Sequence, residues 1–292
     1  MAHKTPVRVD KHIAPIRDFV STRQKNRHGR PLAIIGAPSW LVIYEKVVIF
    51  DQQDNASVPL PLLKYDIATG VEAFSTRRDS VLPCHVITGH QVHGCKVAVV
   101  ERGDLTREDL TGYDALVTNL LGGSIGVRTA NCVPILMYDP VKKAVAAVHS
   151  GWKGTVLRIA EKAINVMCQR YGTRAEDLRV AIGPAIGPDS FQVGEEVVRY
   201  FKEQGFPLDE IWSFRKVIPG KPMSGGHHID LIRANRWLLE SVGVQPGSIL
   251  SVDIDTYTDD EFFSARREGT QCGRTINAIG IYPPSPLSPS AD

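Results

Sequence analysis

The chain contains 292 residues, of which 43% are hydrophobic and 23% are charged, and its formal net charge is +2. This composition is typical of a soluble globular protein and excludes a fibre, a coiled coil or a wholly disordered chain. A charge so close to zero supplies no large positive field for nucleic acid. The apolar stretch at residues 32–44 contains Gly36 and Pro38 and is shorter than the roughly 20 residues of a membrane-spanning helix.

The cysteine count and the N-terminal composition indicate the compartment. Five cysteines are an odd, low number that argues against a disulfide framework. The first residues lack the unbroken apolar segment of a signal peptide, so we expect a cytoplasmic protein. Residues 1–30 hold eight Lys or Arg and two Asp or Glu. This stretch predicts a basic, flexible arm that is either merely solvated or docks an unknown partner.

The predicted elements alternate between strands and helices along the chain. Residues 32–35 and 40–50 favour a strand pair, and residues 51–60 a polar loop. Short apolar runs separated by Gly, Pro and Asp then predict strands at 85–88, 96–100, 114–118, 124–129, 135–138, 144–149, 178–182, 249–254 and 275–281. Apolar residues spaced by three and four predict helices at 155–171, 194–204 and 229–242. We therefore expect a single α/β domain at 31–282 and a disordered Pro/Ser-rich tail at 283–292.

Three residues with metal-ligand chemistry lie at strand ends or turns. The nine histidines form no His-x-His pair, and the chain has no Cys-x-x-Cys or His-Glu-x-x-His motif, so a metal site must be assembled from distant segments. His93, Cys132 and His149 each lie next to a turn-forming Gly or Pro sequence. Two imidazoles and a thiolate suit catalytic zinc, because three protein ligands leave a fourth position open. From residue types alone, ordinary buried Cys and His side chains remain the alternative.

Four sequence blocks, in this order, resemble one family. They are Thr-Ala-Asn-Cys-Val-Pro-Ile-Leu (129–136), Ala-Ala-Val-His-Ser-Gly-Trp-Lys-Gly-Thr (146–155), Ala-Ile-Gly-Pro-Ala-Ile-Gly (181–187) and Glu-Phe-Phe-Ser-Ala-Arg-Arg-Glu-Gly (261–269). Supporting blocks lie at 91–94, 114–118, 191–197 and 230–235. The chain thus resembles the family named multicopper polyphenol oxidase, laccase-domain protein or peptidoglycan editing factor. Its better-characterised members are purine nucleoside phosphorylases with additional adenosine deaminase activity.

The resemblance implies a fold, a cofactor and a reaction. The fold is a mixed α/β sandwich with the metal site in a cleft at strand ends, and the cofactor is zinc held by His93, Cys132 and His149. The reaction is phosphorolysis of adenosine, inosine or guanosine, with methylthioadenosine as a further candidate substrate. Adenosine deamination is the expected side activity, because zinc lowers the pKa of a bound water.

Phosphorolysis needs cations for phosphate and a group that contacts the purine. Arginine is suited to the first task because its planar fork matches phosphate oxygens, and an aromatic ring is suited to the second. Taken singly, each such residue could also be a surface charge or a packing residue. The predicted substrate-binding residues are Gln91, Lys153, Phe263, Arg266, Arg267 and Arg274.

Asp114 and Asn131 are the predicted catalytic residues. Zinc deaminases carry a carboxylate that moves protons, and Asp114 is the best acidic candidate, although an Asp at a strand start is often only a cap. The family usually has Asp directly before the ligand cysteine, where this chain has Asn131. If that residue moves a proton, Asn cannot replace it; if it stabilises a turn, Asn can. Residues 78–90 also replace a longer segment of the family.

Three other functions remain open alternatives. They are copper-dependent polyphenol oxidation, amidase-like editing of cell-wall precursors at the same metal, and a non-catalytic metal-binding or interaction role that Asn131 would mark. The lack of His-x-His pairs disfavours copper. The expected ligands are purine nucleosides and phosphate, with no membrane and no specific nucleic acid as partner. A homodimer is one option for assembly.

Overall fold

The computed structural model describes residues 34–35, 61–220 and 224–282. The chain divides into two units, Met1–Ala33 and Ile34–Asp292, and every described helix and strand belongs to the second. The predicted basic arm, most of the predicted strand pair at 32–50 and the predicted tail at 283–292 lie outside the described residues. None of the helices in the described ranges is long and apolar enough to cross a bilayer.

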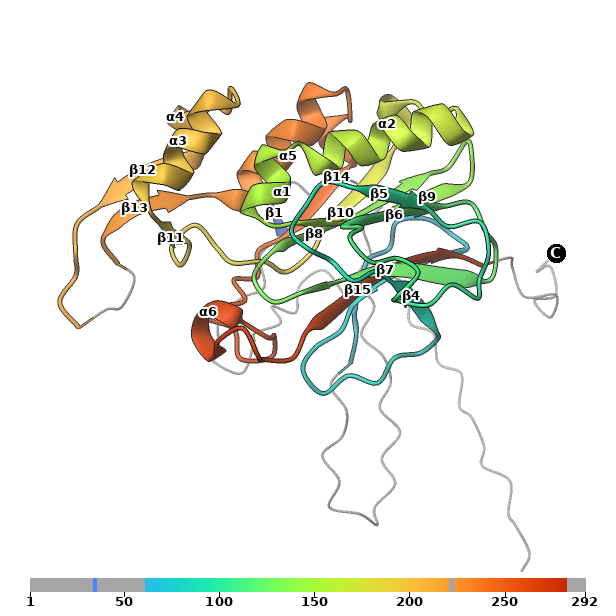
Figure 1. Cartoon of the computed structure of the whole chain (residues 1–292), viewed down its shortest axis with the longest axis horizontal. Helices are drawn as coiled ribbons and strands as arrows, with labels where there is room; N and C mark the ends of the chain where they lie inside the picture. The colour runs from blue at the N-terminus through green and yellow to red at the C-terminus, as the bar shows by residue number, and fades with distance from the viewer. Residues whose placement is uncertain (1–33, 36–60, 221–223, 283–292) are drawn as a thin grey trace, which may run out of the picture. The chain divides into compact units, whose positions relative to one another are not determined.

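The larger sheet has seven strands and is mixed (Figure 1). In spatial order its strands are β1 (Ile34–Ile35), β14 (Ile249–Val252), β10 (Arg179–Ile182), β8 (Val133–Asp139), β9 (Ala144–Ser150), β6 (Ala115–Thr118) and β5 (Val97–Val99). The β14–β10 and β6–β5 pairs are parallel and the others are antiparallel. Every residue of β8 and β9 is buried, as expected for strands covered on both faces.

Five strands form the second sheet, and three form a small antiparallel one. The five-stranded sheet has the order β2 (Leu63–Lys64), β3 (Val71–Ser75), β15 (Thr275–Ile281), β7 (Gly123–Thr129) and β4 (Val86–Thr88), in which only β4 and β7 are parallel. The small sheet has the order β11 (Gln192–Val193), β13 (Gly226–Ile229) and β12 (Trp212–Arg215). The mixed α/β class predicted from the sequence is confirmed.

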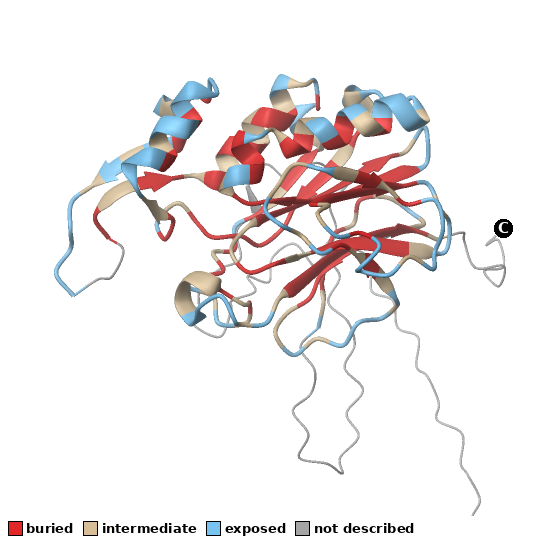
Figure 2. Ribbon diagram, viewed as in Figure 1, coloured by how far each residue is buried: buried red, intermediate tan, exposed pale blue. Residues whose placement is uncertain are grey.

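Helices cover one face of the seven-stranded sheet, and the five-stranded sheet covers the other (Figures 1 and 2). Successive β8 side chains point to opposite faces, so Leu136 and Tyr138 pack with Ile125 of β7 in one core. Ile135 and Met137 instead pack with the helices. These helices are α1 (Trp152–Val156), α2 (Ile159–Tyr171), α3 (Glu195–Glu203), α4 (Leu208–Ile211) and α5 (Leu231–Ser241), with 3-10 turns at Ala175–Asp177 and Pro246–Ser248. The short helix α6 (Ala265–Glu268) lies apart from them, before β15.

The single helix predicted at 155–171 is wrong in one respect, because the chain forms two helices there. Helix α1 ends at Val156 and α2 begins at Ile159. Between them Arg158 has a φ of 60° and a ψ of 41°, a left-handed conformation that interrupts a right-handed helix. Both helices bury their apolar residues in the same core, so the three- and four-residue spacing continues across the break and conceals it in the sequence.

Crossovers between the two large sheets bring distant segments to one place. Strands β4 and β7 are parallel neighbours, so their C-terminal ends lie at the same edge, and the chain then enters β5 and β8 of the other sheet. Strand β9 runs antiparallel to β8 with His149 opposite Pro134. The end of β9 therefore lies beside the start of β8. Residues 89–96, 130–132 and 149–151 meet at this edge.

Candidate metal centre

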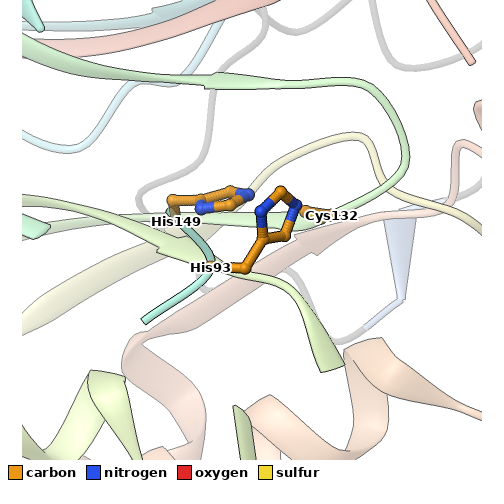
Figure 3. A group of neighbouring side chains, drawn as sticks. All are labelled: His93, Cys132 and His149. Atoms are coloured by element: carbon orange, nitrogen blue, oxygen red, sulfur yellow. The ribbon is translucent and has the colours of Figure 1, made fainter. Parts of the chain in front are cut away.

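His93, Cys132 and His149 gather at this edge, one from each of the three segments (Figure 3). Their potential ligand atoms all lie within 4.8 Å of one another. The two imidazoles meet edge to face, with ring centroids 4.8 Å apart. Burial is graded, because His93 is exposed, Cys132 is half-buried and His149 is buried. The cluster is therefore a potential metal site that is open to solvent on the side of His93. The cleft predicted around it stays a prediction.

Asp114 holds two of the three potential ligands in place. Its carboxylate is completely buried and lies 2.8 Å from Nδ1 of His149. It also accepts hydrogen bonds from the backbone N–H groups of His93 and Gly94, at 2.9 and 2.8 Å. Because Nδ1 of His149 is bonded to Asp114, Nε2 is the nitrogen left for the cluster. A carboxylate behind a histidine ligand is a recurrent partner of bound zinc.

The electrostatics of the cluster favour the ionised forms of Cys132 and Asp114. Burial raises the pKa of the Cys132 thiol, but the charge of His149 and hydrogen bonds from both imidazoles outweigh it and lower that pKa to about 6. Burial lowers the pKa of His149, but the Cys132 thiolate and Asp114 outweigh it and raise that pKa to about 9. Burial also raises the pKa of Asp114, yet the bonds from His149 and Gly94 lower it overall. A thiolate is thus available as a ligand near neutral pH.

The donor set and the space around it fit zinc. Bonds of about 2.0–2.3 Å place the ligand atoms of a tetrahedral zinc roughly 3.5 Å apart, so the observed spread requires only a small closure. A Cβ atom at Gly151 would lie 2.9 Å from Sγ of Cys132 and 3.2 Å from Cδ2 of His93. Glycine therefore keeps the space between these two side chains clear, which explains its place directly after the His149-Ser150 pair.

Asn131 is bonded to protein groups through its whole carboxamide. Its Nδ2 donates to the hydroxyls of Thr256 and Ser264, at 2.9 and 2.8 Å. Its Oδ1 accepts from the backbone N–H of Arg266 at 2.7 Å. The φ of Asn131 is 103°, a region in which Asn is tolerated better than most residues. Asn131 therefore fastens the turn before Cys132 to the 256–266 segment.

Two of the three arginines predicted to bind substrate, Arg266 and Arg267, are bonded to the protein. The Arg267 guanidinium donates to backbone carbonyls of the 256–262 segment and to Glu268. The Arg266 guanidinium donates to the carbonyl of Gln192 at 2.9 Å and lies 5.6 Å from the centroid of the Phe191 ring. Asn131, the residue before Cys132, bonds to Ser264 and to the backbone of Arg266, which places the segment of both arginines next to the cluster. The bonds of their guanidinium groups, however, connect loops of the protein.

The four other predicted substrate-binding residues lie in different settings. The Gln91 amide bonds both backbone groups of Arg128 on β7, at 2.8 and 2.9 Å. Lys153 is exposed on α1, 5.6 Å from the Trp152 ring centroid. Phe263 lies beneath the Arg78 guanidinium at 4.5 Å. Arg274 bonds to carbonyls of its own 270–273 loop.

One supporting residue, Asn235, was not predicted from the sequence. It is completely buried on α5, accepts from the Ser150 hydroxyl at 2.6 Å and donates to the Thr155 hydroxyl at 3.0 Å. It therefore fixes both ends of the turn that follows His149. The signal was present, because Asn235 ends the 230–235 block that supports the family resemblance.

Comparison with known proteins agrees with the resemblance in the sequence blocks. A family model described as multi-copper polyphenol oxidoreductase laccase matches residues 66–282. The chain belongs to this family. Solved structures with the fold of this laccase-family chain include YfiH of Bacillus licheniformis, with a TM-score of 0.67 and 25% identity over 75% of this chain and 96% of that one. YlmD of Geobacillus stearothermophilus gives a TM-score of 0.62 and 26% identity over 74% and 93%.

Curated relatives of this laccase-family chain carry two kinds of name. It is 44% identical to a purine nucleoside phosphorylase of Bacteroides thetaiotaomicron over 60% of its own length and 63% of that protein. It is 41% identical to adenosine deaminase RL5 of an unknown prokaryotic organism, over 68% and 74%. The human purine nucleoside phosphorylase LACC1 is 34% identical over 60% and 40%. The match thus spans less than two thirds of the Bacteroides and human proteins.

Proposed function

We propose that the chain is a zinc-dependent purine nucleoside phosphorylase with an adenosine deaminase side activity. The observation that carries the proposal is the convergence of His93, Cys132 and His149 from three separate segments. Relatives at 44% and 41% identity are named as a phosphorylase and a deaminase. The substrates would be purine nucleosides such as adenosine, inosine and guanosine, together with phosphate.

The choice of zinc over copper rests on the ligands. Two imidazoles and one thiolate form a set that zinc binds in catalytic sites with one position open. Within residues 61–220 and 224–282, this is the one group of three or more His, Cys, Asp or Glu side chains with a metal-ligand arrangement. A multicopper enzyme needs further histidine clusters, which supports zinc.

The chain's own residues would prepare the site. Asp114 would fix the tautomer of His149 and hold the backbone of the His93 loop, so we assign it a positioning role in place of the proton transfer expected from the sequence. Asn131 would hold the turn that carries Cys132. Zinc, when bound, supplies a water of lowered pKa and a Lewis acid. The exposed side of His93 is where a nucleoside would approach.

The test combines metal content with nucleoside turnover. Purified wild type, Cys132→Ala and Cys168→Ala would be compared for zinc content and for turnover of adenosine and inosine, with and without phosphate. Cys168 is exposed on α2 and serves as the matched control. We expect wild type and Cys168→Ala to bind one zinc and to release base only with phosphate, and Cys132→Ala to lose both properties. Ammonia release without phosphate would support the deaminase activity.

Two outcomes would overturn the proposal. The first is stoichiometric zinc in the wild type without turnover of any purine nucleoside. The second is oxidation of phenols by the copper-loaded protein while the zinc-loaded protein leaves nucleosides unchanged.

A further inference from the structure

The small three-stranded sheet ends in a strand with one free edge. Its order is β11, β13, β12, so β12 pairs with β13 on one side and with no strand of the described ranges on the other. The hairpin formed by β12 and β13 extends from one side of the molecule (Figure 1). An unpaired edge presents backbone N–H and C=O groups to which another strand can bind.

Hydrogen bonds on both sides of β13 show which opposed residues of β12 and β13 are bonded to each other. Opposed residues in an antiparallel pair alternate between bonded and non-bonded pairs. The N–H of Asp230 donates to the C=O of Ile211 across the extended register, at 2.7 Å. The N–H of Ile229 instead donates away from β12, to the C=O of Phe191 at 3.3 Å. The next pair, Ile229 with Trp212, is therefore non-bonded.

The backbone of Phe214 consequently points outward at the free edge of β12. Phe214 lies two residues after Trp212 and opposite His227, so this pair is non-bonded as well. Neither the N–H nor the C=O of Phe214 has a partner in the part of the chain that the structure describes. The N–H of Trp212, in contrast, donates to the C=O of Leu208 at the end of α4. Phe214 thus offers a complete donor and acceptor pair.

The side chains at this edge are aromatic and exposed. Phe214 is 66% exposed and Trp212 is 38% exposed. His227 holds both rings, with centroids 5.0 Å from Phe214 and 5.9 Å from Trp212, so that little side-chain entropy remains to be lost on binding. The charge of Arg215, which could repel another strand, is paired with Asp189 of the same chain. Exposed apolar groups gathered in this way are typical of a binding surface.

The sequence Trp-Ser-Phe-Arg-Lys at 212–216 is complementary to a second copy of itself. A twofold axis at Phe214 would place this ring opposite the partner's Phe214, a favourable aromatic pair. Lys216 would lie opposite the partner's Trp212, where an ammonium group over an indole ring is also favourable. Arg215 would lie opposite the partner's Ser213, so no like charges oppose each other. An axis at Arg215 would instead oppose two arginines.

The free backbone groups select the same register. With the axis at Phe214, its N–H in each copy donates to the C=O of the partner's Phe214. By the same alternation the N–H of Lys216 points outward and donates to the C=O of the partner's Trp212. An axis at Ser213 would require the N–H of Trp212, which is already bonded within α4. Only the register at Phe214 forms four new bonds from groups that are free.

We propose that two copies of this chain form a homodimer by antiparallel pairing of their β12 edges about a twofold axis at Phe214. The two small sheets then join into one sheet of order β11-β13-β12-β12-β13-β11. At 38% and 66% exposure, the two aromatic side chains supply about 160–260 Å² per copy. A standard interface buries roughly 800 Å² per partner, so we expect a weak dimer with a Kd of about 10–100 μM. This inference does not depend on the proposed function.

The first experiment measures self-association of the full chain. Wild type, Phe214→Lys and Val141→Lys would be compared by sedimentation equilibrium over a concentration range that spans the expected Kd. Val141, in the turn between β8 and β9, is 60% exposed, and its variant is the matched control. We expect a dimer in wild type and Val141→Lys, and at least tenfold weaker association in Phe214→Lys, because two like charges would meet at the axis.

Two results would overturn the inference. A wild type that stays monomeric over the whole range would assign the free edge of β12 to a different partner. A dimer that Phe214→Lys leaves intact would place the interface elsewhere. Because Phe214 is two-thirds exposed, Phe214→Lys should unfold within about 2 °C of wild type at low concentration, which separates loss of association from loss of the fold.

The second experiment tests the register by disulfide formation between copies. Phe214→Cys and Ser213→Cys would each be made together with Cys168→Ser, which removes the exposed cysteine. Opposed Cα atoms of a bonded pair are about 5.5 Å apart, which is within the range of a disulfide. The two copies of Ser213 would be diagonal neighbours, roughly 7–8 Å apart. Mild oxidation should link Phe214→Cys at least tenfold faster than Ser213→Cys, and equal rates would contradict the axis at Phe214.

Discussion

Replacing Gly151 by alanine tests whether the space between the potential ligands is reserved for a metal. Gly151 has a φ of −69° and a ψ of 171°, an extended conformation that any residue adopts. The substitution therefore introduces no backbone strain. Its effect comes from the new Cβ atom, 2.9 Å from Sγ of Cys132 and 3.2 Å from Cδ2 of His93. Both distances are shorter than normal contacts between carbon and these atoms.

The magnitude follows from which side chain can move. Without metal, the Cys132 thiol can rotate and the exposed His93 ring can turn away, so the free energy of unfolding should change by about 1 kcal/mol or less. With metal, His93 and Cys132 are both fixed as ligands and neither can yield. Disturbances of this kind next to ligands weaken metal binding by about 10- to 100-fold. This corresponds to about 1.4–2.8 kcal/mol of binding free energy.

Competition with a chromogenic chelator would measure the zinc affinity of wild type, Gly151→Ala and Gly103→Ala. A Cβ atom at Gly103 meets nothing within 4 Å, which makes it the matched control. We expect the affinity to fall only in Gly151→Ala, with thermal unfolding of the metal-free proteins nearly the same. Wild-type zinc affinity in Gly151→Ala would refute the reasoning that glycine reserves this space.

Three further predictions concern the groups around the cluster. Asp114→Asn should weaken zinc binding about 10- to 100-fold in the chelator assay. An amide cannot accept all the hydrogen bonds that the Asp114 carboxylate accepts from N–H groups. Unchanged zinc affinity would contradict the positioning role of Asp114. The pKa of Cys132 is lowered to about 6 and that of His149 is raised to about 9, so between these pH values the two residues together hold one proton. Zinc binding in this range should therefore release about one proton. A second proton should be released below about pH 6, and calorimetry in buffers of different ionisation enthalpy counts both. Arg267→Lys should lower the melting temperature by about 3–6 °C, since the lost fork leaves carbonyls unpaired at a cost of about 2 kcal/mol; an unchanged melting temperature would show that those bonds contribute little.

The sequence predicted the parts of the fold whose pattern is local. The strands from residue 85 to 149 have continuous apolar runs between turn residues, and the structure confirms them. Strands β2 and β11 have only two residues each, too few for a periodic pattern. The break between α1 and α2 could not be predicted from the sequence, because packing places Arg158 in a left-handed conformation that arginine does not favour.

The metal ligands could be selected from the sequence, and so could Asp114 and Asn131, whereas the contacts that these two residues make could not be predicted. His93, Cys132 and His149 have turn residues beside them and match family blocks. The contact of Asp114 with His149 instead depends on the register of β6 against β9, in which Ala115 is opposite Val148. Such relations arise only from long-range pairing.

The distribution of the three ligands over separate segments of the chain determines when a metal can bind during folding. In a zinc finger the ligands lie close together in the chain, and the metal organises a peptide that is otherwise unfolded. Here His93 follows β4, Cys132 follows β7 and His149 lies within β9. Asp114 and Asn235 hold the segments around these ligands through bonds between protein groups alone. The chain should therefore fold first and acquire its metal afterwards, so that a chelator removes zinc and leaves the far-ultraviolet circular dichroism of the folded chain intact.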